Sequence, residues 1–340
     1  MNRVFVQGVG VVSPAGWGMS SFCRALEQNE PLPVEALTAP AGQPVMRVRR
    51  VPVPNPKPSF FAHPRLRRTS PIAQFSVGAA LEALGSDQAD SMKQSRLGII
   101  SCAFAGCVNY SRRFYEEVLR EPSTASPLIF PETVFNAPSS HLSAFLGATG
   151  RNYTLVGDQG EFVKALALAA DWLDRGWVDR CLITAAEELD WLTAGALELF
   201  DHGACAAEGA GALCLGRDPS PVELACVTEP QLYDRRRGGR NGRRSMAWPS
   251  EFSPKSCDLL CDGRSGSPVT DHLEDELWKD WPGKRCSPRR VFGEGLGVSG
   301  AWQVLAGIQA LQRGHSGAVF VGVVGTNEQR VGAVFRRNPD

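Results

Sequence analysis

The fold of this chain is decided near its start by the segment Val4-Phe5-Val6-Gln7-Gly8-Val9-Gly10-Val11-Val12-Ser13-Pro14-Ala15-Gly16. Its first part is dominated by valine, a β-branched residue that favours extended backbone, so a buried strand is predicted. Ser13-Pro14-Ala15-Gly16 is typical of a turn, and the stretch Met19–Glu27 that follows is typical of a helix. A strand that leads through a short turn into a helix is the usual beginning of an α/β chain.

The rest of the chain repeats this alternation of strand and helix. Further strands are expected at 96–104, 153–156, 180–185, 210–215, 222–227, 258–261, 317–322 and 332–336, and helices at 75–84, 162–177 and 300–312. Residues 30–64 contain Pro52, Pro54, Pro56 and Pro58 and are expected to form a surface excursion. The prediction is an α/β protein with two unequal halves, 1–218 and 219–340, which divide near Asp218-Pro219-Ser220-Pro221.

Composition narrows the possible functions. Among 340 residues, 36 Lys and Arg balance 36 Asp and Glu, which disfavours a nucleic-acid binder that relies on general positive charge. The longest apolar runs are strand-sized, so no membrane span is expected. The first residues lack the pattern of a signal peptide and suggest a cytoplasmic protein. Ten cysteines are scattered without a CxxC pair, so we expect neither a metal nor another cofactor.

Five motifs, in order, resemble those of the β-ketoacyl synthases. They are Gln7-Gly8-Val9-Gly10-Val11-Val12-Ser13-Pro14-Ala15-Gly16, Asn136 to Gly150, Ala207-Glu208-Gly209-Ala210-Gly211-Ala212, Gly297-Val298-Ser299-Gly300-Ala301 and Gly322-Val323-Val324-Gly325-Thr326-Asn327. Together they span nearly the whole chain. The resemblance implies a thiolase-like fold of two related α/β halves in a layered αβαβα arrangement, with a shortened C-terminal half.

The chain departs from this family at all three reactive positions. Condensing members use a cysteine thiolate to hold the acyl chain as a thioester, and two histidines that stabilise developing negative charge. On the resemblance, Gln159 stands where the cysteine belongs, Asp262 replaces the first histidine and Glu294 the second. One alternative for these three residues is a new acid/base site. The other is that they form local hydrogen bonds, or pair with an arginine such as Arg264, in a pocket that no longer reacts.

A ketosynthase-like chain with glutamine at the nucleophile position resembles the chain-length factors of type II polyketide or aryl polyene synthesis. That resemblance implies a catalytically inactive subunit that forms a heterodimer with an active β-ketoacyl synthase and shapes its acyl tunnel, with acyl carrier protein as a further partner. The candidates for the tunnel wall and the interface are Phe104, Tyr110, Phe114 and Phe130. Ordinary core packing is the alternative for each of these side chains.

Two other functions remain open from the sequence. One is decarboxylation or hydrolysis of an acyl carrier-protein thioester by Gln159, Asp262 and Glu294. The other is a scaffold that binds the acidic carrier protein through an arginine-rich loop, whose candidate residues are Arg235, Arg236, Arg237, Arg240, Arg243 and Arg244. A solvated loop without a partner is the alternative for that segment.

Overall fold

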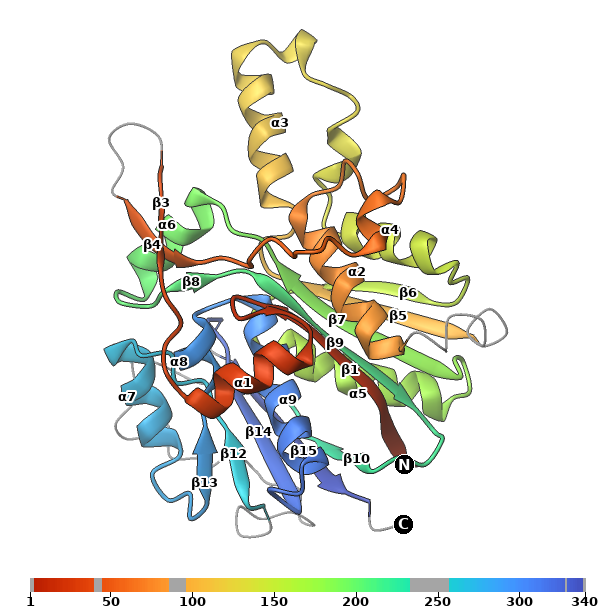
Figure 1. Cartoon of the computed structure of the whole chain (residues 1–340), viewed down its shortest axis with the longest axis vertical. Helices are drawn as coiled ribbons and strands as arrows, with labels where there is room; N and C mark the ends of the chain where they lie inside the picture. Colours follow the sequence, from red (N-terminus) through yellow and green to blue (C-terminus); the bar gives the residue numbers. More distant parts are fainter. Residues whose placement is uncertain (1–2, 40–44, 86–95, 233–256, 328, 339–340) are drawn as a thin grey trace.

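The computed structural model describes residues 3–39, 45–85, 96–232, 257–327 and 329–338. Its main feature is a large mixed sheet whose strands follow the order β13-β12-β14-β15-β10-β1-β9-β7-β5-β6 (Figure 1). The strands from the first part of the chain are β1 (Val4–Ser13), β5 (Leu97–Ala103), β6 (Asn152–Val156), β7 (Arg180–Glu187) and β9 (Gly209–Gly216). Those from the second part are β10 (Val222–Val227), β12 (Leu259–Cys261), β13 (Lys284–Cys286), β14 (Ala318–Val324) and β15 (Gln329–Arg337).

Strand β1 joins these two groups of strands. It pairs antiparallel with β9 from Phe5↔Gly216 to Val12↔Ala210, and with β10 at Val4↔Leu224. The predicted apolar segment therefore becomes a central strand, buried along most of its length. The short strands β2 (Gly16–Trp17) and β11 (Gln231–Leu232) extend the sheet beside β1 and β15.

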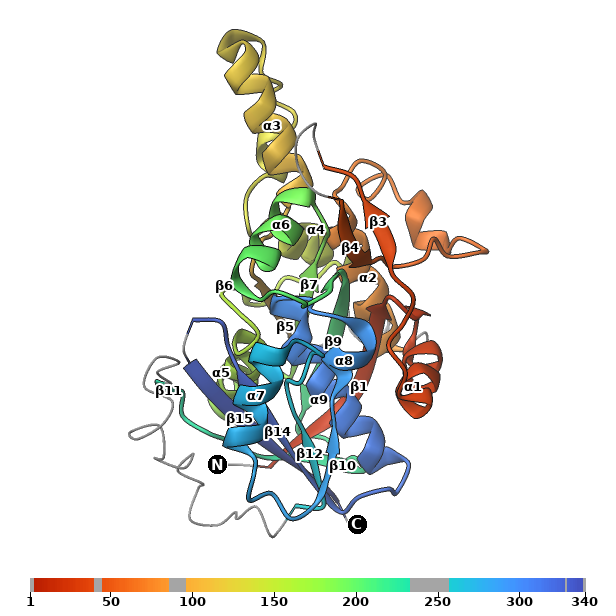
Figure 2. The ribbon, with the colours of Figure 1, turned by 90° about the vertical axis from the view of Figure 1, so that its left-hand side faces the viewer.

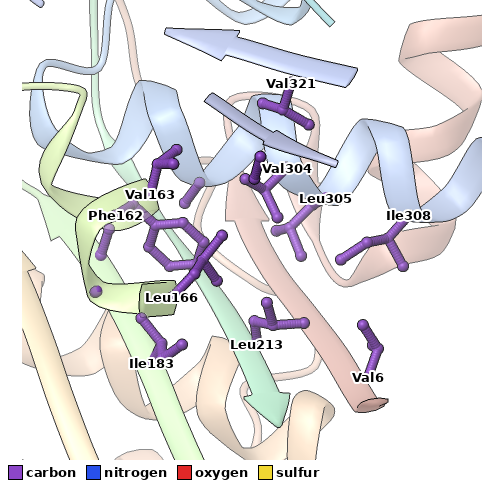
Figure 3. Packing of buried hydrophobic residues seen from close by; sticks show 14 of the residues in the cluster. Val6, Phe162, Val163, Leu166, Ile183, Leu213, Val304, Leu305, Ile308 and Val321 are labelled. Atoms are coloured by element: carbon purple, nitrogen blue, oxygen red, sulfur yellow. The ribbon is translucent and has the colours of Figure 1, made fainter. Parts of the chain in front are cut away.

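Two helices form the central layer of the molecule. Helices α5 (Glu161–Asp174) and α9 (Gly297–Gln312) pack against each other and against strands of both groups. Their apolar side chains meet those of the sheet in the main core, where Phe162 and Leu166 of α5 lie near Ile183 and Leu213 (Figure 3). Helix α9 is buried along nearly all of its length, as expected for a helix enclosed on both sides.

The remaining helices cover the sheet or project from it. Helix α2 (Pro71–Leu84) packs on β1, β9 and β7, and α4 (Ala137–Leu146) on β5 and β6. The others are α1 (Met19–Gln28), α6 (Trp191–Phe200), α7 (Pro268–Leu277) and α8 (Pro288–Phe292). Helix α3 (Val108–Arg120) and the chain after it stand away from the rest of the molecule (Figures 1 and 2). We call residues 108–135 the arm.

The structure corrects two sequence predictions and adds elements that the sequence did not indicate. Residues 30–64 hold strands β3 (Glu35–Leu37) and β4 (Met46–Arg49), and β4 pairs parallel with β8 (Ala206–Ala207). The predicted helix 162–177 ends at Asp174. Helices α3, α6, α7 and α8 and strand β13 were not predicted. The other predicted strands and helices are present within a few residues of their expected bounds. Among the described helices, none has both the length and the apolar content of a membrane span.

Candidate functional site

Gln159 lies in the tight connection between β6 and α5. Asp158 fixes this connection, because its carboxylate accepts hydrogen bonds from the backbone N–H groups of Gly160 at 3.0 Å and Asn327 at 2.9 Å. Helix α9 touches the backbone here: a Cβ on Gly300 would lie 2.0 Å from the carbonyl oxygen of Gln159, so only glycine fits at that position. The first turn of α9 therefore presses against Gln159, whose side chain is fully buried.

The side-chain amide of Gln159 is engaged at both ends. Its Oε1 accepts a hydrogen bond from the backbone N–H of Thr326 at 3.2 Å, and its Nε2 donates one to Glu294 Oε1 at 3.1 Å. Two of the three sequence-predicted reactive positions are thus in direct contact. The loop with Thr326, which the sequence links to a family motif, completes this hydrogen-bonded group.

Glu294 is 1% exposed and has four partners. Besides Gln159, its Oε1 accepts from the backbone N–H of Leu296 at 2.7 Å and from Ser299 Oγ at 2.9 Å, while its Oε2 forms an ion pair with Arg289. Gly293 has a φ of +96°, a conformation that favours glycine, and it places Glu294 beside the carbonyl of Cys205. A carboxylate with this set of donors is stabilised as the anion.

Asp262 is separate from this group. It follows β12 and is fully buried, with its Oδ2 2.5 Å from Arg285 Nε and its Oδ1 2.5 Å from Ser287 Oγ. Asp262 thus pairs with an arginine, as one alternative from the sequence has it, but the arginine is Arg285 and not the suggested Arg264. The guanidinium of Arg264 binds Asp275, and its backbone N–H lies 3.3 Å from Asp262 Oδ1. The three predicted positions therefore do not form one acid/base constellation.

A cavity of about 450 Å³ opens beside Gln159 and Glu294. Its walls are mainly apolar and come from α6, α7 and the loop after β14. Its lining includes Phe104, Phe200, Leu273, Glu274, Arg289 and Thr326. Asp262 does not line it. An apolar cavity with a few polar groups at one end is the common form of a small-molecule site.

Glu274 is a residue at this cavity that the sequence reasoning missed. It is 1% exposed on α7, and its Oε2 accepts a hydrogen bond from Trp278 Nε1 at 2.7 Å. Burial raises the pKa of the Glu274 carboxyl, the charge of Asp262 raises it further, and Arg289 opposes both effects. Pro268 at the start of α7 and the spacing of Leu273 and Leu277 were the available signals for this helix.

Glu187 holds in place the part of the cavity wall that Phe104 forms. Its carboxylate accepts hydrogen bonds from the backbone N–H groups of Phe104 and Ala105, the latter at 3.1 Å. Burial nevertheless raises the pKa of Glu187 to about 8. This carboxyl fixes the position of Phe104, which follows β5 and lines the cavity.

The four predicted aromatic residues divide into two places. Phe104 is 43% exposed and belongs to the cavity, whereas Tyr110, Phe114 and Phe130 belong to the arm (Figure 2). The ring centroids of Phe114 and Phe130 are 5.4 Å apart, so this contact joins α3 to the chain that follows it. The Tyr110 hydroxyl donates a hydrogen bond to the backbone carbonyl of Arg68.

The six predicted carrier-protein arginines, Arg235 to Arg244, lie outside the described residues. Within the described residues, no group of three or more His, Cys, Asp or Glu side chains is arranged to hold a metal ion.

Comparison with known proteins gives the family. The model of the beta-ketoacyl synthase N-terminal domain matches residues 1–197. Among curated proteins, none matches this sequence. Solved structures share the fold over 99% of this chain. One is a beta-ketoacyl synthase from Burkholderia phymatum with 15% identity and a TM-score of 0.83, of which 100% of the chain is covered.

Two further solved structures include chain-length factors in their descriptions. The first is the ishigamide ketosynthase/chain length factor, with 16% identity, a TM-score of 0.77 and 99% of that chain covered. The second is the ketosynthase ApeO in complex with its chain length factor ApeC from Xenorhabdus doucetiae, with 14% identity, a TM-score of 0.81 and 98% of that chain covered. At such identities these likenesses establish the fold. Because the family model covers more than half of the 340 residues, this chain belongs to the β-ketoacyl synthase family and has its thiolase-like α/β fold.

Proposed function

We propose that this chain is a chain-length-factor-type subunit, which pairs with an active ketosynthase and contributes to the wall of its acyl tunnel without reacting itself. The observation that carries the proposal is the state of Gln159. The sequence resemblance assigns its amide to the family's nucleophile position, and hydrogen bonds with Thr326 and Glu294 hold this amide in place. An amide does not form the thioester on which condensation depends, because that step requires a thiolate or a comparable nucleophile.

The buried carboxylates support the same conclusion. Condensation develops negative charge on an enolate, which the family stabilises with hydrogen-bond donors. Glu294 places a carboxylate beside Gln159 instead. Two like charges 4 Å apart repel by about 4 kcal/mol at an effective dielectric constant of about 20, which corresponds to roughly a thousandfold in rate. Arg289 already pairs with Glu294 and offsets only part of this repulsion.

The arm and the neighbouring edge of the sheet supply the surface for a partner. Large apolar side chains are exposed on the arm, among them Tyr115 at 63%, Leu119 at 69% and Leu128 at 80%. Strand β6 lies at one end of the described sheet and exposes Tyr153 and Val156. Exposed apolar groups gathered in this way mark protein–protein contacts. Gln159 directly follows β6, so a partner seated here lies close to the replaced nucleophile position.

Variants of the arm test this assignment. Leu119→Asp and Leu128→Asp place a charge in the proposed contact and are expected to weaken binding to the ketosynthase partner by at least about tenfold, because burying an unpaired charge is costly. Leu232→Asp is the matched control, since Leu232 is 86% exposed on β11. Affinity is measured by titrating each purified variant against the partner. Equal affinity for all three variants contradicts the proposed contact surface.

A second candidate, decarboxylation or hydrolysis of an acyl carrier-protein thioester, is favoured by one observation. Glu274 at the cavity has a raised pKa and can hold a proton near neutral pH. Mass spectrometry of malonyl and acyl carrier protein after incubation with the purified subunit distinguishes the two candidates. Unchanged substrate supports the non-reacting subunit. If the wild type removes carbon dioxide or the acyl group from the carrier protein and the Glu274→Gln variant does not, the enzyme is supported.

A further inference from the structure

A second cavity of about 530 Å³ lies beside β4, β8 and α8, apart from the one next to Gln159. The two neighbouring arginines of α8 line different cavities: Arg289 lines the first, and Arg290 lines the second. We call the second one the Arg49 cavity. No part of the proposed subunit function makes use of it.

Arg49 is the unusual group in this cavity. It is only 7% exposed, yet its one side-chain hydrogen bond among the described residues runs from Nε to the carbonyl of Leu32, at 2.8 Å. No described carboxylate lies within ion-pair distance of its guanidinium. Burial lowers the pKa of Arg49, and the positive charge of Arg47 lowers it further, whereas Cys205 opposes them. A buried charge without a counter-ion is costly, so this arginine calls for an anion.

The fold holds Arg49 firmly in this position. Strand β4 pairs with β8, with Arg49 opposite Ala207. Gly293 leaves room for the guanidinium, because a Cβ on that residue would lie 3.3 Å from Arg49 Nη1. A site whose charged group is fixed by strand pairing is organised before any ligand arrives.

The charges around the cavity agree with an anionic ligand. Arg47 and Arg290 also line it, are exposed, and form no ion pair with a described residue. Glu198 is the single acidic residue among the lining residues, and it faces His202 at 3.9 Å. Three guanidinium groups against one carboxylate leave a net charge of +2, which matches a phosphate dianion better than a carboxylate.

Most of the other side chains that line the cavity are apolar, and they determine the second property of the ligand. It includes Val34, Met46, Ala194, Ala204 and Ala206. We propose that the Arg49 cavity binds a phosphate monoester that carries a short apolar group, with the phosphate on Arg47, Arg49 and Arg290 and the apolar group against these side chains. A volume of about 530 Å³ is within the ordinary range for a small-molecule pocket.

Calorimetric titration with hexyl phosphate tests the site on the full chain at low salt. We expect a Kd below about 1 mM for the wild type, and binding that is weaker by about tenfold or more in each of Arg47→Ala and Arg290→Ala, because each removes a charge-assisted contact. Arg49→Gln should abolish binding. Arg24→Ala is the matched control, since Arg24 is an exposed arginine of α1 outside the cavity. Arg47 and Arg290 are exposed, so their variants keep the test decisive even if Arg49→Gln fails to fold.

Two further ligands separate the contribution of the phosphate charge to binding from that of the apolar group. Inorganic phosphate and hexanol should each bind at least about tenfold more weakly than hexyl phosphate, because each lacks one half of the recognition. Absence of binding by hexyl phosphate at about 10 mM overturns the proposal, as does wild-type affinity in both Arg47→Ala and Arg290→Ala. Inorganic phosphate that binds as tightly as hexyl phosphate overturns the apolar part of the site.

Cys205 provides a readout that locates the ligand. Its thiol is half-buried in this cavity, and burial raises its pKa. Hexyl phosphate should slow the alkylation of Cys205 by iodoacetamide. The rate of this alkylation is measured by mass spectrometry of the peptides. Cys286 is a half-buried thiol elsewhere, on β13, and serves as the internal control. Equal alkylation rates of Cys205 with and without hexyl phosphate contradict binding in this cavity.

Discussion

The ion pair between Arg289 and Glu294 gives the sharpest prediction for the site. Both residues are almost completely buried, at 3% and 1% exposed. Arg289→Met removes the cation and leaves Glu294 with only the neutral donors of Gln159, Leu296 and Ser299. Breaking one half of a buried ion pair costs about 3–5 kcal/mol, so we expect a loss of this size in the free energy of unfolding.

The double variant Arg289→Met/Glu294→Gln separates charge from packing. It removes both charges and keeps most of the neutral hydrogen bonds, so it should recover much of the loss, as double-mutant cycles of coupled residues do. Arg96→Met is the matched control: Arg96 forms an exposed ion pair with Asp179, and its loss should cost less than about 1 kcal/mol.

Urea unfolding at pH 7.5, followed by tryptophan fluorescence, measures these differences in one protein background, since the chain contains eight tryptophans. The reasoning is refuted if Arg289→Met is no more destabilising than Arg96→Met. It is also refuted if the double variant is as unstable as the sum of its two single variants.

Three further predictions concern stability, chemistry and binding. The folded-state pKa of Glu187, about 8, lies above its unfolded value of about 4.5, so the stability that its neutral form contributes is present at low pH and is lost as the pH rises through 8. Between pH 6 and 9, the free energy of unfolding measured in urea should therefore fall less in Glu187→Gln than in the wild type. Identical pH profiles of the two proteins would contradict this. Gln159→Cys should not restore condensation of malonyl carrier protein in a product assay, because Glu294 remains beside the new thiol; turnover by the isolated variant would show that the carboxylate is compatible with the reaction. Replacing the six arginines from Arg235 to Arg244 by alanine should weaken carrier-protein binding and flatten its salt dependence in a titration series, and an unchanged salt slope would exclude this segment from the contact.

The sequence allowed most of the large sheet to be predicted, because its strands are short apolar runs bounded by turns. The predicted strand 4–12 and the predicted helix 300–312 are present as β1 and α9, since both lie in the core and are dominated by apolar residues. Helix α7 escaped prediction because its charged residues hide a weak apolar face. Strand β4 escaped because its parallel partner, β8, is far away in the sequence.

The same limit explains why the arginine that pairs with Asp262 is Arg285 and not the suggested Arg264. Arg264 is two residues away along the chain, but β12 and β13 run parallel with Cys261 opposite Cys286, which brings Arg285 to the Asp262 carboxylate. The resemblance assigned Gln159, Asp262 and Glu294 alike to the family's reactive positions, and the structure brings Gln159 and Glu294 into direct contact. Strand pairing, which short-range sequence patterns do not reveal, determines the partner of Asp262.

Co-expression with a candidate ketosynthase partner tests the central claim most directly. We predict a stable complex with one copy of each subunit, and a product that appears or changes its chain length only when this subunit is present. A stable homodimer of this chain that leaves both the ketosynthase and its product unchanged would contradict the proposal.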